Sequence, residues 1–237
     1  MLDEIRRRGR IICSYEELTY LVKSNSNCAV FYINPYVMGK LELERYALDD
    51  RIYFVIEGNS AVYLSKIMFG TKFESLNFDD SGIADKVLGK VNLENTSIRF
   101  IGGTQNDIEH YRQKIIQKYK NFKGAQFLNG YDWDEQRIKK LRDLVDLTII
   151  SMGVGKQELL SLQLLDTQKT QNVIVAGGYI SQFAASEGSI YPSIIVKLKL
   201  RFLYRAFKNR EILKRLLFIY PRVYVIWLVY LFRRKSF

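Results

Sequence analysis

Glycine-rich turns follow three of the predicted β-strands. They are Gly102 with Gly103, the run Gly153–Glu158 (GVGKQE), and Gly177 with Gly178. Glycine lets backbone N–H groups approach an anion closely, and a helix that begins at the turn adds a partial positive charge. The three turns together favour a site for a diphosphate or a nucleotide, although tight backbone geometry explains any single turn equally well. The chain has no GxxxxGKS or GxxxxGKT motif and no GxGxxG motif with an acid at the next strand end, which disfavours a P-loop enzyme and a simple dehydrogenase.

Two acidic spots could carry chemistry. Glu57 closes another predicted strand in the run RIYFVIEG. At that position a carboxylate lies at the ligand edge of the sheet, where it can take a proton from an attacking hydroxyl group; a solvated turn residue is the alternative. Asp132–Asp134 (DWD) fits a metal-binding Asp-x-Asp pattern, but it precedes the helical run EQRIKKLRDLV. Acids are favoured at a helix N-terminus without any metal, so we expect these two to serve the helix.

The composition is that of a folded protein with few of the most reactive residue types. Of 237 residues, 48% are hydrophobic and 26% charged, which predicts a large domain with a real core. Two cysteines, Cys13 and Cys28, cannot form a disulfide framework or a four-ligand zinc site, and favour a reducing compartment. The single histidine, His110, flanks the apolar stripe of a predicted helix, so we assign it no chemical role.

Short β-branched runs alternate with helical patterns as far as Pro192, which predicts an α/β fold with a Rossmann-like, mainly parallel sheet flanked by helices. The predicted strands are Cys28–Ile33, Arg51–Ile56, Ser97–Ile101, Leu147–Met152 and Val173–Ala176. The clearest helix is Asp107–Tyr119, which Thr104 and Asp107 can cap. Because such sheets bind ligands at the carboxyl ends of their strands, the glycine turns and Glu57 are expected at that edge.

The C-terminal segment carries most of the net charge of +11. From Arg201 to Phe237 there are ten basic residues and one acid, which amounts to +9. Its longest unbroken apolar run, Val223–Phe232, has about half the length that a bilayer span needs. Tyrosine and tryptophan rings among these residues suit the lipid headgroup level, so we expect the segment to lie on an anionic membrane. A buried terminal helix is the alternative, and the many apolar residues disfavour a nucleic-acid surface.

Several motifs in the second half of the chain occur in a fixed order. They are Lys156-Gln157-Glu158, Gly177-Gly178, Phe183-Ala184, Pro192 and Leu200–Arg205 (LRFLYR). In order and spacing these resemble the WecG/TagA/CpsF glycosyltransferases, family 26. That family shows G-x-G-x-P-K-Q-E, then V-G-G with F-x-x-x-A-G, a proline, and G-L-E-W-L-Y-R before a basic tail.

The resemblance continues upstream and covers nearly the whole chain. Asn34 in INPYVM is similar to the family's T-x-N-A-E segment, and Glu57 with Gly58 stands where the family has its catalytic Asp-Gly. Gly102 follows the next strand as in the family, and Asn129–Tyr131 (NGY) resembles its H-G-Y-F turn. The chain departs from the family pattern at four positions: Tyr32 replaces a threonine, Glu57 an aspartate, Ser75 a common arginine and Gly155 a proline.

The resemblance implies an inverting, metal-independent transferase that moves a hexosyl or N-acetylhexosaminyl group from a UDP-sugar to a polyprenyl-diphosphate-linked glycan. The expected setting is bacterial surface polysaccharide synthesis: capsule, O-antigen, exopolysaccharide or teichoic acid linkage. Glu57 is then expected as the base, with Asp79 and Asp80 in reserve, and Arg205 as the cation for the departing diphosphate. The residues expected to bind the donor are Asn34, Gly58, Gly102, Gly130, Tyr131, Gly153, Gln157, Glu158, Gly177 and Gly178.

The expected organisation is a catalytic domain of residues 1–190 that binds the nucleotide sugar, followed by a membrane-association appendage of residues 191–237. The charged start MLDEIRRRGR lacks an apolar stretch, so no cleavable signal is expected, and the protein should be peripheral on the cytoplasmic membrane face. Self-association into homo-oligomers is compatible with the resemblance. A non-catalytic, membrane-peripheral protein that binds a nucleotide sugar or a lipid carrier is the alternative, which the departures at Tyr32, Ser75 and Gly155 leave open.

Overall fold

The computed structural model describes residues 10–235, apart from residues 25, 71, 95, 142 and 199. Within these residues a single seven-stranded sheet has the order β1-β3-β2-β7-β6-β4-β5, and every neighbouring pair is parallel. The strands are β1 (Ile11–Ile12), β2 (Cys28–Ile33), β3 (Ile52–Ile56), β4 (Ile98–Gly102), β5 (Gln126–Leu128), β6 (Val145–Ser151) and β7 (Thr170–Val175). The prediction of an α/β fold with a Rossmann-like parallel sheet is confirmed.

All five predicted strands form, and β2 has the predicted bounds. Strand β7 begins three residues earlier than predicted, because the polar side chains in its first half form hydrogen bonds within the fold. The Thr148 hydroxyl donates to the Thr170 hydroxyl over 3.0 Å, and the Asn172 amide donates to the Val22 carbonyl over 3.1 Å. Strands β1 and β5 were not predicted, since edge strands of two and three residues give no readable periodicity.

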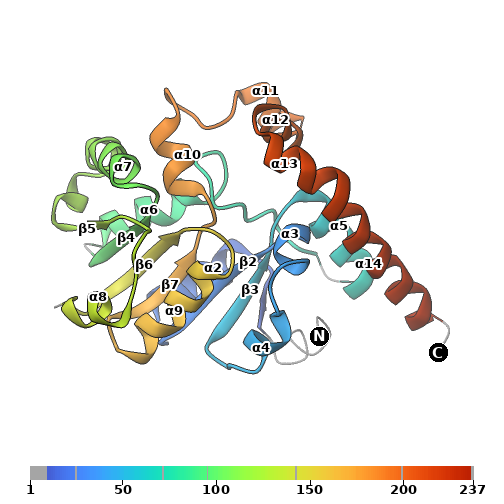
Figure 1. Cartoon of the computed structure of the whole chain (residues 1–237), viewed down its shortest axis with the longest axis horizontal. Helices are drawn as coiled ribbons and strands as arrows, with labels where there is room; N and C mark the ends of the chain where they lie inside the picture. The colour runs from blue at the N-terminus through green and yellow to red at the C-terminus, as the bar shows by residue number, and fades with distance from the viewer. Residues whose placement is uncertain are drawn as a thin grey trace.

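Helices cover both faces of the sheet (Figure 1). They are α2 (Tyr15–Lys23), α3 (Pro35–Met38), α4 (Leu43–Ala47), α5 (Asn59–Phe69), α6 (Ala84–Leu93), α7 (Gln105–Lys118), α8 (Glu135–Lys140), α9 (Lys156–Asp166), α10 (Tyr179–Ala185), α11 (Ser193–Lys197), α12 (Arg201–Lys208), α13 (Arg210–Lys214) and α14 (Tyr220–Lys235), with a 3-10 turn η1 (Lys120–Gly124) and a π-helical turn η2 (Arg215–Ile219). The predicted cap of α7 is confirmed: the Thr104 hydroxyl accepts from the Asp107 N–H, and the Asp107 carboxylate accepts from the Thr104 N–H. His110 lies on the exposed side of this helix.

Alternate residues of each strand point to opposite faces and build two cores. Val30 and Tyr32 of β2 belong to the core under α2, α6, α7 and α10, while Phe31 and Ile33 belong to the core under α9. Both cores consist of buried apolar side chains, as expected for a parallel sheet covered on both sides. The strand ends are therefore fixed, and so are the side chains that follow them.

The C-terminal helices pack on the α/β domain and share its second core. Val223 and Trp227 of α14 are 7% and 5% exposed, and both belong to that core together with strand residues such as Phe31. A Cβ atom on Gly39, which follows α3, would lie 3.1 Å from the Ile219 side chain, so the two segments are in close contact. The predicted boundary at residue 190 falls in the loop between α10 and α11. The helices after it continue the same folded unit.

The other side of α14 faces solvent. Ile226 is 65% exposed and Val229 is 46% exposed, whereas Trp227 between them is buried. Among the described residues, none of the helices combines the length and the apolar character that crossing a bilayer requires. One face of the helix thus packs in the core, and another apolar face is left exposed to solvent.

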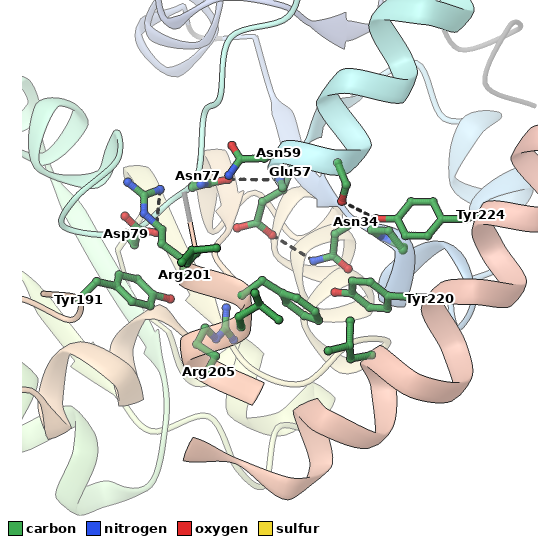
Figure 2. Close-up of a pocket in the computed structure, with 17 residues that line it drawn as sticks. Asn34, Glu57, Asn59, Asn77, Asp79, Tyr191, Arg201, Arg205, Tyr220 and Tyr224 are labelled. Atoms are coloured by element: carbon green, nitrogen blue, oxygen red, sulfur yellow. Dashed lines mark hydrogen bonds and ion pairs between the residues drawn. The ribbon is translucent and has the colours of Figure 1, made fainter. Parts of the chain in front are cut away.

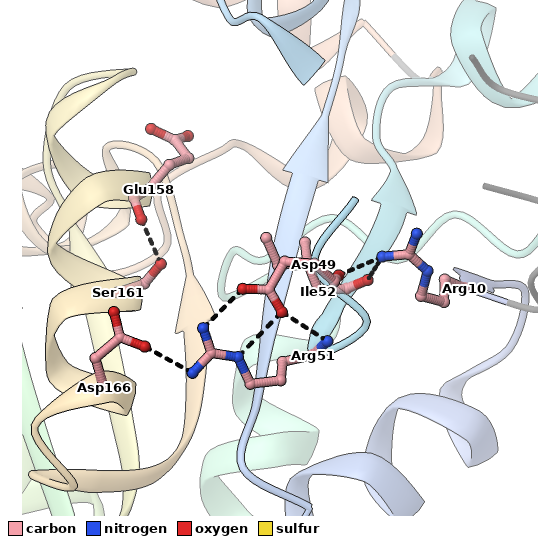
Figure 3. A network of polar contacts seen from close by, with 7 residues as sticks. All are labelled: Arg10, Asp49, Arg51, Ile52, Glu158, Ser161 and Asp166. Atoms are coloured by element: carbon pink, nitrogen blue, oxygen red, sulfur yellow. Dashed lines mark hydrogen bonds and ion pairs between the residues drawn. The ribbon is translucent and has the colours of Figure 1, made fainter. Parts of the chain in front are cut away.

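A polar network fixes the amino-terminal side of the sheet, opposite the edge where ligands bind in such folds. The Arg51 guanidinium bridges Asp49, at 2.7 Å, and Asp166 at the end of α9, at 2.8 Å (Figure 3). The buried Arg10 donates to the Ile52 carbonyl over 3.2 Å, which holds the start of β3. The contacts of Arg51 with Asp166 and of Arg10 with Ile52 join residues that are distant in sequence, so they stabilise the arrangement of β1, β3 and α9.

Candidate active site

A divided concave region lies at the carboxyl ends of β2, β3, β6 and β7, where parallel α/β sheets bind ligands. It consists of two adjoining cavities with volumes of about 330 and 290 Å³. We call the larger one the apolar lobe and the smaller one the polar lobe, after the atoms that line them. Five residues line both lobes: Asn34, Glu57, Asp79, Tyr191 and Arg205. Asn34, Glu57 and Arg205 were predicted as site residues from the sequence, and Asp79 was a reserve candidate for the base.

Glu57 lies at the junction of the two lobes, because it lines both, and Figure 2 shows it among the residues of the apolar lobe. It directly follows β3, and its N–H donates to the Ile33 carbonyl at the end of β2, 2.9 Å away. Its Oε2 accepts a hydrogen bond from the Asn34 amide over 3.1 Å. The Asn34 Oδ1 in turn caps α3 by accepting from the N–H groups of Tyr36 and Val37. Because the cap fixes the orientation of the amide, Asn34 holds the Glu57 carboxylate in place.

The neighbouring Asp79 is the second carboxylate on the cavity wall. It accepts from the Ser81 hydroxyl over 2.8 Å and forms an ion pair of 3.5 Å with Arg201. Burial raises the pKa of Asp79, and Arg201 opposes that shift. Asp80, in contrast, lines neither lobe; its Oδ2 accepts from the Ile190 N–H over 2.8 Å and so holds the chain before α11. Of the two reserve candidates for the base, Asp79 is the one that reaches the cavity.

Two guanidinium groups from the C-terminal helices reach the polar lobe. Arg205 of α12 lines both lobes and lies beside Tyr191, whose pKa burial raises to about 12 while Arg205 acts in the opposite direction. Arg215 of η2 lines the polar lobe and stacks over the Tyr36 ring at 4.0 Å. Sequence reasoning identified Arg205 only. Arg215 is one of many basic residues in the tail, and nothing in its spacing marks it as facing the cavity.

The glycine turns divide into two groups. Gly153, Gly177 and Gly178 line the polar lobe. Gly102 and Gly130 line neither lobe: a Cβ on Gly102 would lie 2.3 Å from the Ser151 carbonyl oxygen, and one on Gly130 would lie 3.0 Å from the Gly102 Cα. These two glycines allow close packing of backbone at the ends of β4 and β6. The next residue, Tyr131, is 55% exposed and also lies outside both lobes.

Gln157 and Glu158 hold the turn between β6 and α9. The Glu158 carboxylate accepts from the Gly155 N–H over 2.6 Å and from the Gln157 amide over 3.0 Å. Gln157 accepts from the Met152 N–H over 3.2 Å. Gln157 lines the polar lobe, whereas Glu158 is 1% exposed and burial raises its pKa. The Gly155 N–H group, which belongs to the turn predicted to bind an anion, is therefore already used inside the turn.

Gly58, which follows Glu57, lies on the wall of the apolar lobe. Its φ of 93° is in the region that favours glycine, and its N–H donates to the Asn77 side chain over 3.3 Å. A larger residue would strain this turn. The glycine therefore lets the chain leave β3 for α5 at the point where Glu57 must face the cavity.

The C-terminal helices supply most of the apolar lobe's wall. Their side chains there are Leu200, Phe202, Leu203, Leu216, Tyr220 and Tyr224. Phe202 stacks on Tyr220 with ring centroids 4.7 Å apart, and the Tyr224 and Ser60 hydroxyls share a short hydrogen bond (Figure 2). From the sequence, Tyr220 and Tyr224 were predicted to lie at the lipid headgroup level. Their place in the cavity depends on which side of each helix meets the domain.

Asp134 of the Asp-x-Asp sequence caps α8, because its carboxylate accepts from the Arg137 N–H over 2.7 Å. The helix-terminus interpretation is confirmed for this residue. Across the described part of the chain, no three His, Cys, Asp or Glu side chains gather in a way that could hold a metal ion.

A parallel α/β sheet with carboxylates, guanidinium groups and a divided cavity at its carboxyl edge defines a Rossmann-like fold with a candidate ligand-binding site. The chain belongs to the WecG/TagA/CpsF family of glycosyltransferases: residues 13–237 match the family described as "Glycosyl transferase WecG/TagA/CpsF family". The match includes the C-terminal helices, and it confirms the resemblance found in the sequence motifs. No curated protein gives a significant match. The protein is therefore a glycosyltransferase.

Proposed function

We propose that this glycosyltransferase moves a hexosyl or N-acetylhexosaminyl group from a UDP-sugar to a polyprenyl-diphosphate-linked glycan, with inversion and without a metal. The observation that carries the proposal is the position of Glu57 at the junction of a polar and an apolar lobe. A base at that position can reach a hydroxyl group in one lobe and a sugar in the other. Family membership supports a role in bacterial surface polysaccharide synthesis.

In the proposed reaction, Glu57 takes the proton of the acceptor hydroxyl as its oxygen attacks the anomeric carbon of the donor sugar. The new bond joins that carbon to the acceptor oxygen, and the bond to the diphosphate oxygen breaks. UDP leaves with the bonding electrons from the opposite face of the ring. A single displacement inverts the anomeric configuration. Asn34 contributes by holding the base in one orientation.

The departing diphosphate needs positive charge close to its oxygens. Arg205 and Arg215 supply two guanidinium groups at the polar lobe, and the turns at Gly153 and Gly177 supply backbone N–H groups. Arginine binds phosphate oxygens with two parallel hydrogen bonds, which makes it suited to the role that a metal has in other transferases. Both arginines come from the C-terminal helices, so these helices belong to the catalytic machinery.

The donor part of this proposal is tested by thermal shift of the full chain in mild detergent. We expect UDP at a hundredfold excess over its Kd to raise the melting temperature by about 5–10 °C, with the same rise in EDTA. A panel of UDP-glucose, UDP-galactose and UDP-N-acetylhexosamines then ranks the donor sugars. Absence of a shift with every nucleotide would contradict a UDP-sugar donor, and a shift abolished by EDTA would contradict metal independence.

We further propose that the protein lies on the cytoplasmic membrane face through the uncovered side of α14. The charge of the C-terminal segment favours anionic lipid, and Ile226 and Val229 offer apolar side chains to the acyl boundary. A lipid-linked acceptor is itself held in that membrane. Docking there would bring the acceptor to the apolar lobe, whose wall the same C-terminal helices form.

The membrane contact is tested with the double variant Ile226→Asp, Val229→Asp. Both residues are exposed, so folding should be unaffected, while partitioning onto vesicles that contain phosphatidylglycerol should fall at least about a hundredfold. Leu93→Asp, at the end of α6, is the control, because Leu93 is 82% exposed and belongs to another helix. Flotation of the double variant at the level of the native protein would place the membrane contact elsewhere.

A further inference from the structure

Tyr32 has a buried hydroxyl group that lacks a hydrogen-bond partner among the described residues. The residue lies near the end of β2 and is 6% exposed. Its ring packs edge-on against Phe78, with centroids 6.0 Å apart, so the ring position is fixed by the core. A buried hydroxyl without a partner costs free energy, and it needs an explanation.

The position of Tyr32 indicates which kind of group it could bind. Tyr32 lines the polar lobe but not the apolar lobe. Burial and the nearby carboxylates of Glu57 and Asp79 raise the pKa of the phenol well above its usual value. The hydroxyl therefore keeps its proton and is available as a neutral hydrogen-bond donor.

The carboxylates of Glu57 and Asp79 indicate whether a phosphate or a sugar binds beside Tyr32. A diphosphate would be repelled by Glu57 and Asp79, and the guanidinium groups that attract it belong to Arg205 and Arg215. A sugar hydroxyl, in contrast, can accept from a phenol and donate to a carboxylate at the same time. The part of the polar lobe that Tyr32, Glu57 and Asp79 line thus fits a neutral polyhydroxy group.

We propose that the Tyr32 hydroxyl donates a hydrogen bond to a hydroxyl group of the sugar being transferred, and so positions that sugar over Glu57. The proposal rests on the proposed UDP-sugar donor and adds the residue that recognises its sugar. Tyr32 is one of the positions at which the chain departs from the family pattern. Recognition by this phenol would therefore be a property of this protein.

The test compares the native protein with Tyr32→Phe, which removes the hydroxyl and keeps the ring. Affinities are measured by calorimetry for UDP and for UDP-glucose, UDP-galactose and the two UDP-N-acetylhexosamines. We expect Tyr32→Phe to weaken the best-bound UDP-sugar about tenfold and to leave the affinity for UDP unchanged. The melting temperature of the ligand-free variant should be equal to or above that of the native protein, because no partner is lost in the fold.

Tyr111→Phe is the matched control. Tyr111 also has a buried hydroxyl, which lies beside the Tyr179 hydroxyl, but Tyr111 lines neither lobe, so removal of its hydroxyl should leave both affinities unchanged. If Tyr32→Phe weakened the binding of UDP and of the UDP-sugar equally, the phenol would contact the nucleotide and not the sugar. Unchanged affinities, or a lower melting temperature, would mean that the phenol serves the fold. Each of these results overturns the proposal. If the native protein binds UDP, and binds none of the UDP-sugars more tightly than UDP, the proposed contact between Tyr32 and the sugar is contradicted, while the uridine nucleotide site is retained. If it binds no uridine nucleotide, the proposed donor fails as well.

Discussion

Glu57→Gln should lower the turnover number for glycosyl transfer about a thousandfold, while the variant folds normally and binds the donor with native affinity. General-base catalysis contributes on the order of a hundred to ten thousandfold, and glutamine cannot accept the proton. The substitution preserves side-chain length, and a glutamine oxygen can still accept from the Asn34 amide at the cap of α3. A loss confined to turnover would therefore report on the proton transfer itself.

Asp79→Asn provides the comparison for this result. Asp79 also lines both lobes, but its carboxylate is engaged by the Ser81 hydroxyl and by Arg201. We expect a decrease of about tenfold, from altered packing of the C-terminal segment. If Glu57→Gln retained near-native turnover while Asp79→Asn lost it, Asp79 would be the base.

Arg205→Ala should lower kcat/KM about a hundred- to a thousandfold, because the guanidinium that faces both lobes is lost from the site of the departing diphosphate. Arg205→Lys should recover part of the loss, since an ammonium group keeps the charge but not the paired hydrogen bonds. The measurement is steady-state kinetics of UDP release with saturating acceptor. Affinity for UDP, measured separately, should fall as well, because UDP is the group that the arginine stabilises.

The matched control for Arg205 is Arg210→Ala on the adjacent helix α13. Arg210 is exposed and lines neither lobe, so its removal changes the net charge by the same amount without reaching the cavity. We expect native kinetics. Equal losses in the two variants would indicate that the tail acts through its overall charge rather than through a defined contact.

The strands of the sheet were predictable because they are short, β-branched and buried on both faces, which leaves a clear signal in runs such as CAVFYI. The edge strands β1 and β5 were not, because two or three residues carry no period. Glu57 could be found because it follows a strand, and every strand end of a parallel sheet meets the same edge. Asn34 was found through the family resemblance.

The contribution of the C-terminal helices was harder to predict. The run from Leu216 to Phe232 is apolar on every side, so its sequence cannot tell which side chains meet the core, the cavity or a membrane. In the structure Trp227 meets the core, Tyr220 meets the cavity, and Ile226 is exposed. Likewise, Gly102 ends β4 and Gly153 follows β6, yet only Gly153 reaches the polar lobe; β4 is closer to the edge of the sheet than β6.

The most direct test of the proposed function is the anomeric configuration of the product. The native protein is incubated in EDTA with the UDP-sugar that binds best and with polyprenyl-diphosphate-linked acceptors, and the new glycosidic bond is examined by NMR. Because UDP-sugars of this kind carry an α-linked sugar, a single displacement assisted by Glu57 predicts a β-linked product whose formation does not require a metal. An α-linked product would contradict the single displacement, and UDP release without a new glycosidic bond would contradict transfer to a lipid-linked glycan.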